Sequence, residues 1–374
     1  MTTSSSTVNA AAAGLDKSKR RICVLPVAGK EDPTQMLMMQ AVDQGGCFEL
    51  RHGVQTRFFA ATRTCLKYHP DFLYFDWISR YCVGRTRLVT LVKLVAFWLD
   101  VQIVTKIFRR PIVWSLHNLQ SHEQSANSRW EMPMQRYFAR HCQIIRVFSD
   151  AAVDRAQHQL GVNRSKLRVL PVGNYIDYYP NQISMADARL KLGLAQGDFV
   201  LLWLGSIRPY KGLHELVEAF RRVAQPHWRL VIAGKPFVKS YAKEIEALAQ
   251  TDSRIQFHGR FIGEEELQVY YNAANVVTLP FVEVENTSSL VVAMGFRKPV
   301  LAPNLGVIGE RLCHQPELVY EAGGLEGALQ KLSELSLERI AKIGELNSAE
   351  ICRYSWCDMA KIFAELSGEH LPAM

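Results

Sequence analysis

The stretch Val200-Leu-Leu-Trp-Leu-Gly-Ser-Ile-Arg-Pro-Tyr-Lys-Gly212 determines the fold class. Its first five residues are apolar and predict a buried strand, and the residues after Gly212 have the apolar spacing of a helix. Gly205 allows the chain to turn sharply between the two. A helix N-terminus presents free N–H groups, and Arg208 and Lys211 add two positive charges at the same edge. The stretch therefore predicts a diphosphate-binding cradle, with a solvated basic turn as the simpler alternative.

Short apolar runs alternate with helical patterns on both sides of this stretch, which is typical of parallel sheets covered by helices. Two series of strands are predicted: residues 21–26, 72–75, 111–116, 143–148 and 167–172, then residues 199–204, 228–232, 255–258, 276–279 and 299–302. The predicted fold class is α/β, with two doubly wound Rossmann-like domains facing a central cleft. Ligands of such sheets bind beyond the carboxyl ends of the strands, so the chemistry is expected in this cleft.

The pattern also predicts the domain boundaries. Residues 1–20 are small and polar and predict a disordered N-terminus. Residues 21–178 form the first predicted domain, and residues 196–350 form the second. Residues 179–195 are expected to be the linker between them. Residues 351–374 are predicted to form a helix that crosses back to the first domain.

Composition excludes several classes of protein. The chain of 374 residues is 48% hydrophobic and 21% charged, which is ordinary for a folded globular protein. Its eight cysteines include no Cys-x-x-Cys pair, so neither a zinc site nor a redox motif is predicted and reduced thiols are expected. The first residues lack a basic and apolar leader, and we therefore expect a cytoplasmic protein.

Positive charge is concentrated in the first half, where residues 1–178 hold 24 Lys and Arg against 13 Asp and Glu. Residues 80–110 interleave seven cations with apolar side chains, which suits an anionic membrane surface. A core-facing amphipathic helix with a solvated basic edge explains the same pattern equally well. No unbroken apolar run is longer than seven residues, so we expect peripheral attachment to the inner face of the cell membrane and no spanning segment. The candidate membrane residues are Arg85, Arg87, Lys93, Phe97, Trp98, Lys106, Arg109 and Arg110.

Three further segments follow predicted strands of the second series. One ends at Lys235, one ends at Phe261, and the segment 284–289 leads into a helix with capping residues whose N–H groups and hydroxyls are expected to face the cleft. Neither Gly-x-Gly-x-x-Gly nor a Walker A motif is present, so dinucleotide and ATP sites lack support. The residues assigned to the donor diphosphate are Arg208, Lys211, Gly205, Ser288 and Ser289. Those assigned to the nucleotide or sugar are Gly234, Lys235, Arg260, Phe261, Glu285, Asn286 and Thr287.

With these motifs in this order, the chain resembles glycosyltransferases of the two-domain B fold (GT-B). The closer resemblance is to the xanthan-type β-mannosyltransferases, which extend a lipid-linked oligosaccharide with GDP-mannose. It rests on Ile-Arg-Pro-Tyr-Lys-Gly at 207–212, Leu-His-Asn-Leu-x-x-His-Glu at 116–123, Asn-x-Ser at 286–288 and Arg-x-Pro-Val-Leu-Ala-Pro at 297–303. The resemblance implies a hexosyltransferase of exopolysaccharide biosynthesis that uses no cofactor. The donor, a nucleoside-diphosphate sugar, would bind to the domain of residues 196–350. The acceptor, a lipid-linked glycan, would bind to the membrane-facing domain of residues 21–178.

Several positions depart from the family pattern. Retaining relatives carry Glu-x7-Glu across the second block, and the second position is Val292 here, which favours an inverting reaction and a β-linkage. Asp76-Trp77 stands where a His-Trp pair is usual, and Gly173-Asn174 stands where a His-Gly pair is usual. The last two changes concern the acceptor side of the cleft.

An inverting reaction needs a general base within reach of the acceptor hydroxyl. Asp76 and His117 each end a predicted strand, and Glu123 follows in the next loop, so these three are the candidate catalytic residues. We rank His117 and Asp76 above Glu123, although a helix cap and a structural histidine are the simpler explanations of the first two. No Asp-x-Asp motif is present, and the cations with the dipole at Ser288 can stabilise the leaving diphosphate, so no metal is predicted.

Three alternatives remain open at this point. One is a retaining transferase of the same fold with another donor or acceptor, which the anomeric configuration of the product would separate. Another is a non-catalytic sugar-nucleotide binding protein, which donor turnover would exclude. Nucleic-acid binding has the least support, because the basic segment is interleaved with apolar residues and no base-stacking or zinc module is present.

Overall fold

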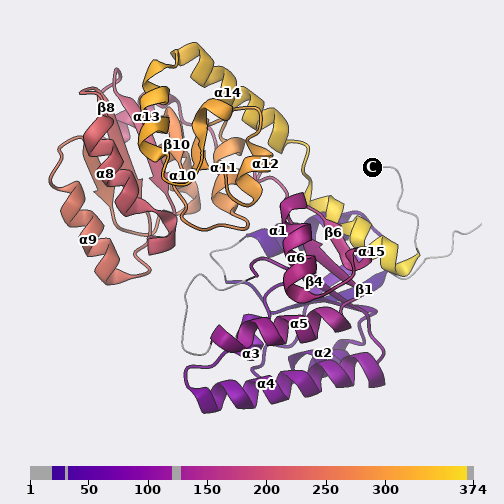
Figure 1. Ribbon diagram of the computed structural model, residues 1–374. Helices are drawn as coiled ribbons and strands as arrows, with labels where there is room; N and C mark the ends of the chain where they lie inside the picture. The colour runs from indigo at the N-terminus through magenta and orange to yellow at the C-terminus, as the bar shows by residue number, and fades with distance from the viewer. Residues whose placement is uncertain (1–18, 30–32, 120–127, 369–374) are drawn as a thin grey trace, which may run out of the picture.

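The computed structural model describes residues 19–29, 33–119 and 128–368, which fold into two α/β domains (Figure 1). The first domain is built on six parallel strands, β1 (Arg20–Leu25), β2 (Phe48–His52), β3 (Phe72–Phe75), β4 (Ile112–Ser115), β5 (Ile144–Val147) and β6 (Leu167–Val169). Its sheet has the order β2-β1-β3-β4-β5-β6. The helices are α1 (Thr34–Gln44), α2 (Ala60–Tyr68), α3 (Ser79–Cys82), α4 (Arg87–Gln102), α5 (Glu131–His141) and α6 (Asp150–Leu160).

The second domain also has six parallel strands, β7 (Phe199–Leu204), β8 (Trp228–Ala233), β9 (Ile255–His258), β10 (Val276–Thr278), β11 (Val300–Pro303) and β12 (Val319–Tyr320). Its sheet has the order β12-β11-β10-β7-β8-β9. The helices are α7 (Met185–Lys191), α8 (Leu213–Val223), α9 (Lys239–Ala249), α10 (Glu264–Ala273), α11 (Ser288–Gly295), α12 (Val307–Arg311), α13 (Leu325–Glu334) and α14 (Leu337–Ile351). In each sheet the later strands add on the other side of the first one, which is the doubly wound arrangement that the sequence predicts.

Both sheets are covered by helices on both faces, and most residues of the central strands are apolar for this reason. In β1, Cys23 and Leu25 join the cluster that contains α4 and α5 side chains, whereas Ile22 and Val24 join the cluster on the opposite face with α1. Successive strand residues point to opposite faces, so one short run contributes to two cores. Several α-helices and strands were absent from the sequence prediction, namely β2, β12, α2, α3, α7 and α12.

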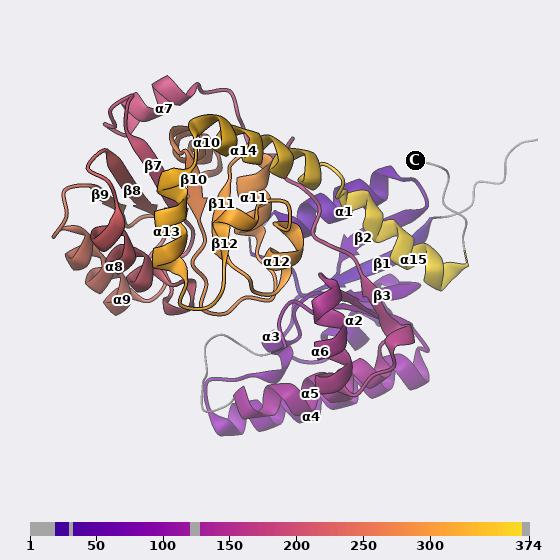
Figure 2. The same ribbon diagram turned by 45° about the horizontal axis from the view of Figure 1, so that its top comes forward.

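The end of the chain returns to the first domain. Helix α14 ends on the second domain, and α15 (Met359–Ser367) lies against the first one (Figures 1 and 2). Phe363 makes edge contacts with Phe48 and Tyr74, at centroid distances of 5.8 and 6.1 Å. The two domains are therefore joined by the linker before α7 and also by this terminal crossing.

Helix α4 lies along the edge of the first domain that is farthest from the second domain in both views (Figures 1 and 2). A π-helical turn at Ile103–Ile107 continues it, and the combined helix Arg87–Ile107 is long and apolar enough to cross a membrane by length and composition. This finding differs from the prediction that no segment could span. The prediction considered unbroken apolar runs, whereas single polar residues such as Lys93 and Thr90 interrupt a helix without making it polar.

One face of α4 is part of the domain core and the other is exposed. The exposed face carries large apolar side chains, which are Leu88, Val89, Leu91, Val92, Val95, Trp98 and Leu99. Two predicted membrane residues do not lie there. Phe97 is 4% exposed and stacks on Tyr81 in the core, and the Lys93 ammonium donates hydrogen bonds to the Arg80 and Val83 carbonyls. Both belong to the buried side, because residues three to four positions apart along a helix share a face.

Candidate active site

A cavity of about 210 Å³ lies between the two domains. From the first domain and the segment that follows β6 it is lined by Thr34, Asp76, Trp77, His117, Asn118, Val172 and Tyr175. From the second domain it is lined by Tyr210, Lys211, Phe281, Val284, Asn286, Thr287, Ser288 and Ser289. The residues come from the carboxyl ends of both sheets, which is where ligands bind in doubly wound folds.

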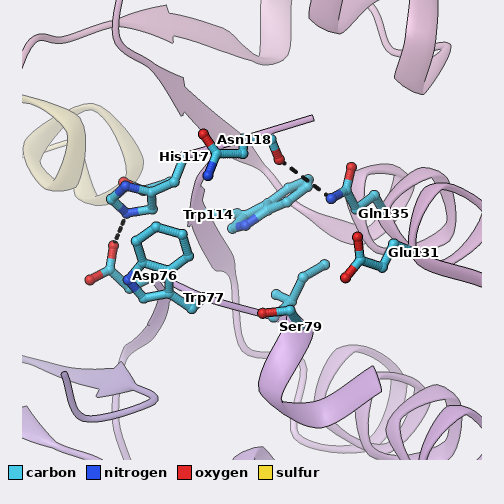
Figure 3. A pocket seen from close by; sticks show the side chains of 10 residues that line it. Asp76, Trp77, Ser79, Trp114, His117, Asn118, Glu131 and Gln135 are labelled. Carbon is cyan, nitrogen blue, oxygen red and sulfur yellow. Dashed lines mark hydrogen bonds and ion pairs between the residues drawn. The ribbon is translucent and has the colours of Figure 1, made fainter. Parts of the chain in front are cut away.

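The acceptor-side candidates His117 and Asp76 form a hydrogen-bonded pair in this cavity (Figure 3). Asp76 directly follows β3, and His117 comes two residues after β4, the neighbouring strand. The His117 Nε2–H group donates to Asp76 Oδ1. Trp77 stacks on the imidazole with a centroid distance of 3.9 Å and an interplanar angle of 14°, so the ring is fixed in position and in orientation. The remaining ring nitrogen, Nδ1, has no hydrogen-bond partner among the described residues.

Asp76 is buried and held by several polar groups. Gln35 Nε2 donates to Asp76 Oδ2 at 3.1 Å, and the Tyr74 hydroxyl donates to Oδ1 at 3.4 Å. Burial by itself raises the pKa of this carboxyl, but the charge and hydrogen bond of His117, with the nearby charge of Arg146, leave the pKa of Asp76 lowered. The carboxylate is therefore ionised and can hold a charged imidazolium.

Arg146 is a buried cation near the carboxylate of Asp76. It lies in β5, is buried, and donates from Nε to the Leu170 carbonyl at 2.8 Å and from Nη2 to the Pro171 carbonyl at 2.7 Å. The guanidinium also lies 4.6 Å from the centroid of the Phe148 ring. Sequence reasoning missed Arg146 and Gln35. Arg146 could have been noticed as a charged residue inside an otherwise apolar strand, whereas Gln35 gave no signal.

On the donor side, Lys211 lies close to Gly205 and Ser289. Arg208 is not among the residues that line the cavity. A Cβ atom added to Gly205 would lie 2.8 Å from Lys211 Nζ and 3.9 Å from Ser289 Oγ, so the three residues surround a common space. Burial, with the nearby charge of Arg208, lowers the pKa of Lys211 to about 8. Arg208 lies over the Phe237 ring, 3.3 Å from its centroid, in a cation–π contact. Burial disfavours the charged form of this ammonium, and an anionic ligand beside it would favour that form again.

Two close approaches of the backbone explain the glycines of the cradle. Gly212 has φ +66°, and a Cβ atom there would lie 1.8 Å from the Pro280 carbonyl oxygen. A Cβ atom at Gly234 would lie 1.7 Å from the Gly205 carbonyl oxygen. No side chain fits at either position, so the loops after β7, β8 and β10 converge as closely as their backbones allow. Thr287 caps α11 by accepting from Ser289 N–H at 3.2 Å, which directs the start of this helix to the cavity.

Other predicted donor residues lie at the edge of the same sheet but do not line the cavity. Arg260 pairs with Glu266, with one contact at 2.8 Å, and also donates to the Tyr270 hydroxyl at 3.2 Å. Phe261 is 52% exposed, and Lys235 Nζ lies 5.7 Å from the centroid of its ring. These residues and Gly234 are therefore outside the lining of the cavity.

Glu285 makes an ion pair between the domains. Arg155 of α6 donates to Glu285 Oε2 at 2.5 Å, and the pKa of Glu285 is raised by burial despite this cation. Nearby, Glu310 accepts from the N–H groups of Asp150 and Ala151 at 3.1 and 2.7 Å, so a second-domain carboxylate caps the N-terminus of α6. The predicted sugar-binding Glu285 is thus engaged in holding the two domains together in this structure. Asn286 and Thr287, its neighbours, do line the cavity.

The third candidate base, Glu123, lies outside the described residues. Among residues 19–29, 33–119 and 128–368, no group of three or more His, Cys, Asp and Glu side chains is arranged to hold a metal ion.

Comparison with known proteins places this site in a class. The model of the family "Glycosyl transferases group 1" matches residues 198–336, the second domain. Among solved structures, sucrose-phosphate synthase from Thermosynechococcus elongatus is similar over 94% of this chain and 100% of that chain, with a TM-score of 0.73 and 17% identity. A UDP and glucose complex of Anabaena Alr3699/HepE is similar over 94% and 100%, with a TM-score of 0.70 and 19% identity. The fold is that of the GT-B glycosyltransferases, as the sequence predicts.

Curated relatives narrow the class. A GDP-mannose:glycolipid 4-beta-D-mannosyltransferase of Xanthomonas campestris pv. campestris is 27% identical over 267 residues, which cover 68% of this chain and 67% of the relative. A lipopolysaccharide 1,2-N-acetylglucosaminetransferase of Salmonella typhimurium is 26% identical over 195 residues, which cover 48% and 50%. The chain is a glycosyltransferase with the GT-B fold, and its second domain matches the group 1 family.

Proposed function

We propose that this enzyme transfers mannose from GDP-mannose, with inversion, to a hydroxyl group of a lipid-linked glycan during exopolysaccharide assembly. The observation that carries the proposal is the His117–Asp76 pair, which faces Lys211, Ser288 and Ser289 across one cavity between the domains. A general base on one wall and an anion-binding edge on the other are the two parts that a single displacement at the anomeric carbon requires.

In this proposal the reaction proceeds as follows. His117 Nδ1 removes the proton of the acceptor hydroxyl as its oxygen bonds to the anomeric carbon, and the bond from that carbon to the diphosphate breaks on the opposite face. Asp76 stabilises the imidazolium and holds its orientation, as in other His–carboxylate pairs. The negative charge that develops on the leaving GDP is stabilised by Lys211, Arg208 and the N-terminus of α11.

The choice of donor rests on the relatives. Two curated proteins with 27% identity bear the name GDP-mannose:glycolipid 4-beta-D-mannosyltransferase. The second candidate, a retaining reaction with a uridine-diphosphate sugar, is favoured by solved proteins of this fold that bind UDP-glucose. Val292, where retaining relatives carry a glutamate, is buried in an apolar environment and supplies no carboxylate, which supports inversion.

A nucleotide panel tests the donor. GDP, UDP, ADP and dTDP are added separately, and the melting temperature is recorded, because a ligand that binds only the folded state stabilises it by mass action. We expect GDP to give the largest increase, and GDP-mannose to be consumed in the presence of a glycolipid acceptor. A larger increase with UDP, or turnover of UDP-glucose in preference to GDP-mannose, would support the second candidate.

Helix α4 is the basis for a further part of the proposal, peripheral attachment of the enzyme to the inner face of the cell membrane. Its exposed apolar row lies on a helix at the edge of the first domain far from the second domain (Figure 1), and Leu88 is 71% exposed. Arg85, Arg87, Lys106 and Arg109 are exposed near the two ends of the combined helix. An apolar stripe with cations at both ends is the pattern of a helix that lies in the interface of an anionic bilayer. Attachment along this face would leave the cavity between the domains open to the donor.

Within that segment, Asp100 argues against insertion of the whole helix. Its carboxylate accepts from Ala61 N–H and Thr62 N–H at 3.0 and 2.7 Å, and it is buried against α2. These bonds hold one face of α4 to the domain. Docking by the exposed face keeps them, whereas crossing the bilayer would break them.

A further inference from the structure

Helix α6 of the first domain is bonded to the second domain at two places, where the two domains meet (Figure 2). The Arg155 guanidinium donates to Glu285 Oε2 at 2.5 Å. The Glu310 carboxylate accepts from the N–H groups of Asp150 and Ala151 at 3.1 and 2.7 Å. Both places lie within the first two turns of the helix. We refer to these bonds together as the α6 contact.

On the second-domain side, the α6 contact is attached to the donor side of the catalytic cavity. Val307, at the start of α12, donates its N–H to the Glu285 carbonyl at 3.2 Å. Gly306 has φ +52°, and a Cβ atom there would lie 2.3 Å from the Val284 carbonyl oxygen, so the two segments touch backbone to backbone. Residues 286–289, which continue the segment of Glu285, line the cavity. A shift of Glu285 would therefore move the donor side of the cavity with it.

On the first-domain side, the start of α6 is attached to the proposed base. Phe148 and Ser149 connect the end of β5 to the first residue of the helix. The Phe148 ring packs against the His117 imidazole, with the two centroids 5.0 Å apart. Ser149 caps the helix, because its hydroxyl accepts from the Ala152 N–H at 3.2 Å. A shift of the start of α6 would therefore move a ring that contacts the base.

The ion pair of the α6 contact is partly shielded from water. The side chains of Arg155 and Glu285 are 37% and 23% exposed. Glu285 also lines a small cavity together with His117 and Asn118, so the pair lies close to the reacting groups. Removal of one partner of a desolvated ion pair leaves the other charge without compensation. Loss of either side chain is therefore expected to loosen the two domains at this place.

We infer that Arg155 and Glu285 are positioning residues for the transfer, and that the α6 contact sets the distance between His117 and the diphosphate site. The inference rests on the proposed function in taking His117 as the base. The acceptor oxygen and the leaving diphosphate must lie on opposite faces of one anomeric carbon, and a displacement of about 1 Å can lower the rate about 100-fold. Glu285 thereby acts through Arg155 and does not bind the donor sugar.

Exchange of the two charges tests the inference. Arg155→Glu and Glu285→Arg each place like charges opposite one another and should lower kcat at least tenfold, with the GDP-induced rise in melting temperature unchanged. The double variant restores an ion pair and should bring kcat to within threefold of the wild type. Arg155→Ala removes the pair without creating repulsion and should also lower kcat. Lys342→Gln, which breaks an exposed ion pair with Glu345 in α14, is the control and should change neither quantity.

Two results would overturn the inference. One is a double variant that stays as slow as Glu285→Arg alone, because Glu285 would then act by direct contact with the donor. The other is a loss of the GDP effect together with kcat in Arg155→Ala, because the pair would then serve nucleotide binding.

Small-angle X-ray scattering gives a measurement that does not depend on turnover. The radius of gyration should be larger in Arg155→Glu than in the wild type, and the double variant should restore it. Equal radii in all three proteins would contradict the inference. If the radii follow the expected order but GDP-mannose is never consumed, the proposed function fails and the α6 contact keeps its role in holding the domains.

Discussion

The two walls of the catalytic cavity are built in different ways. The donor wall comes from contiguous segments, with Tyr210 and Lys211 in the loop after β7 and Ser288 and Ser289 at one helix start. The acceptor wall is assembled from residues far apart in sequence, since Gln35, Asp76, Arg146 and His117 come from different elements and meet only in the fold. The donor wall can therefore be recognised from a motif, whereas the acceptor wall depends on packing.

The largest expected effect is on the acceptor wall. His117→Ala should reduce kcat about 10³-fold, within the range for loss of a general base, and leave the GDP-induced rise in melting temperature unchanged. Asp76→Asn should give a similar loss, because the imidazolium loses its counter-ion. Sugar transfer and the GDP-induced rise in melting temperature are measured for both variants. His158→Ala, at an exposed position, is the control. Loss of GDP binding together with activity would show that the two walls are not separate.

The donor wall should respond differently. Arg208→Ala and Lys211→Ala should each reduce kcat/KM about 10²- to 10³-fold, as for loss of one preorganised stabilising group, and should also reduce the GDP-induced rise in melting temperature. The neighbouring exposed position Lys239→Ala serves as the control for loss of a surface cation. Near-normal turnover in both variants would show that Arg208 and Lys211 do not bind the diphosphate.

Membrane attachment predicts opposite results for substitutions at two neighbouring residues of α4. Trp98 is 46% exposed, so Trp98→Asp should release the protein from anionic vesicles with little change in melting temperature, whereas Phe97→Asp should unfold it. Arg85→Glu with Arg87→Glu should weaken binding by at least about 30-fold, since each lost cation contributes about 1 kcal/mol and the new carboxylates are repelled by the anionic surface. Co-sedimentation with vesicles and thermal melting are measured together. Unchanged sedimentation of the double charge variant would contradict attachment through this helix.

The smallest effect expected is a pH dependence confined to the donor wall. The pKa of Lys211 is about 8 in the free protein, and a bound diphosphate raises it, so binding takes up a proton only above that pH. GDP affinity should therefore fall about tenfold between pH 7 and pH 9. Lys211→Arg keeps its charge and should abolish this decrease. A profile that is equally steep in Lys211→Arg would assign the titration to another group.

Sequence reasoning predicted most of the fold because the strands are continuous apolar runs between helical patterns. The second series of strands was found with small differences at the ends. Elements β2 and α2 were missed because Glu49 and Arg51 break the apolar run of the edge strand, and α2 mixes Arg63 and Lys67 with small residues. Such segments take their structure from contacts with the rest of the domain, which one sequence does not display.

The same limit applies to the site. The cations of the donor wall and the pair His117 and Asp76 were predicted, but that the two are bonded to each other was not. The opposite faces of α4 could not be assigned from composition either, because Phe97 and Trp98 are adjacent in sequence and lie on different sides of the helix. Glu285 was expected to face a sugar and instead pairs with Arg155, a contact that exists only when the domains meet.

The anomeric configuration of the product tests the central claim most directly. GDP-α-mannose is incubated with the enzyme and a neutral alkyl glycoside, and the one-bond C–H coupling at the new anomeric carbon is measured by NMR. The His117–Asp76 base acting in a single displacement predicts a β-linked product. An α-linked product would contradict the account, because it requires retention of configuration and leaves the pair without the role assigned to it.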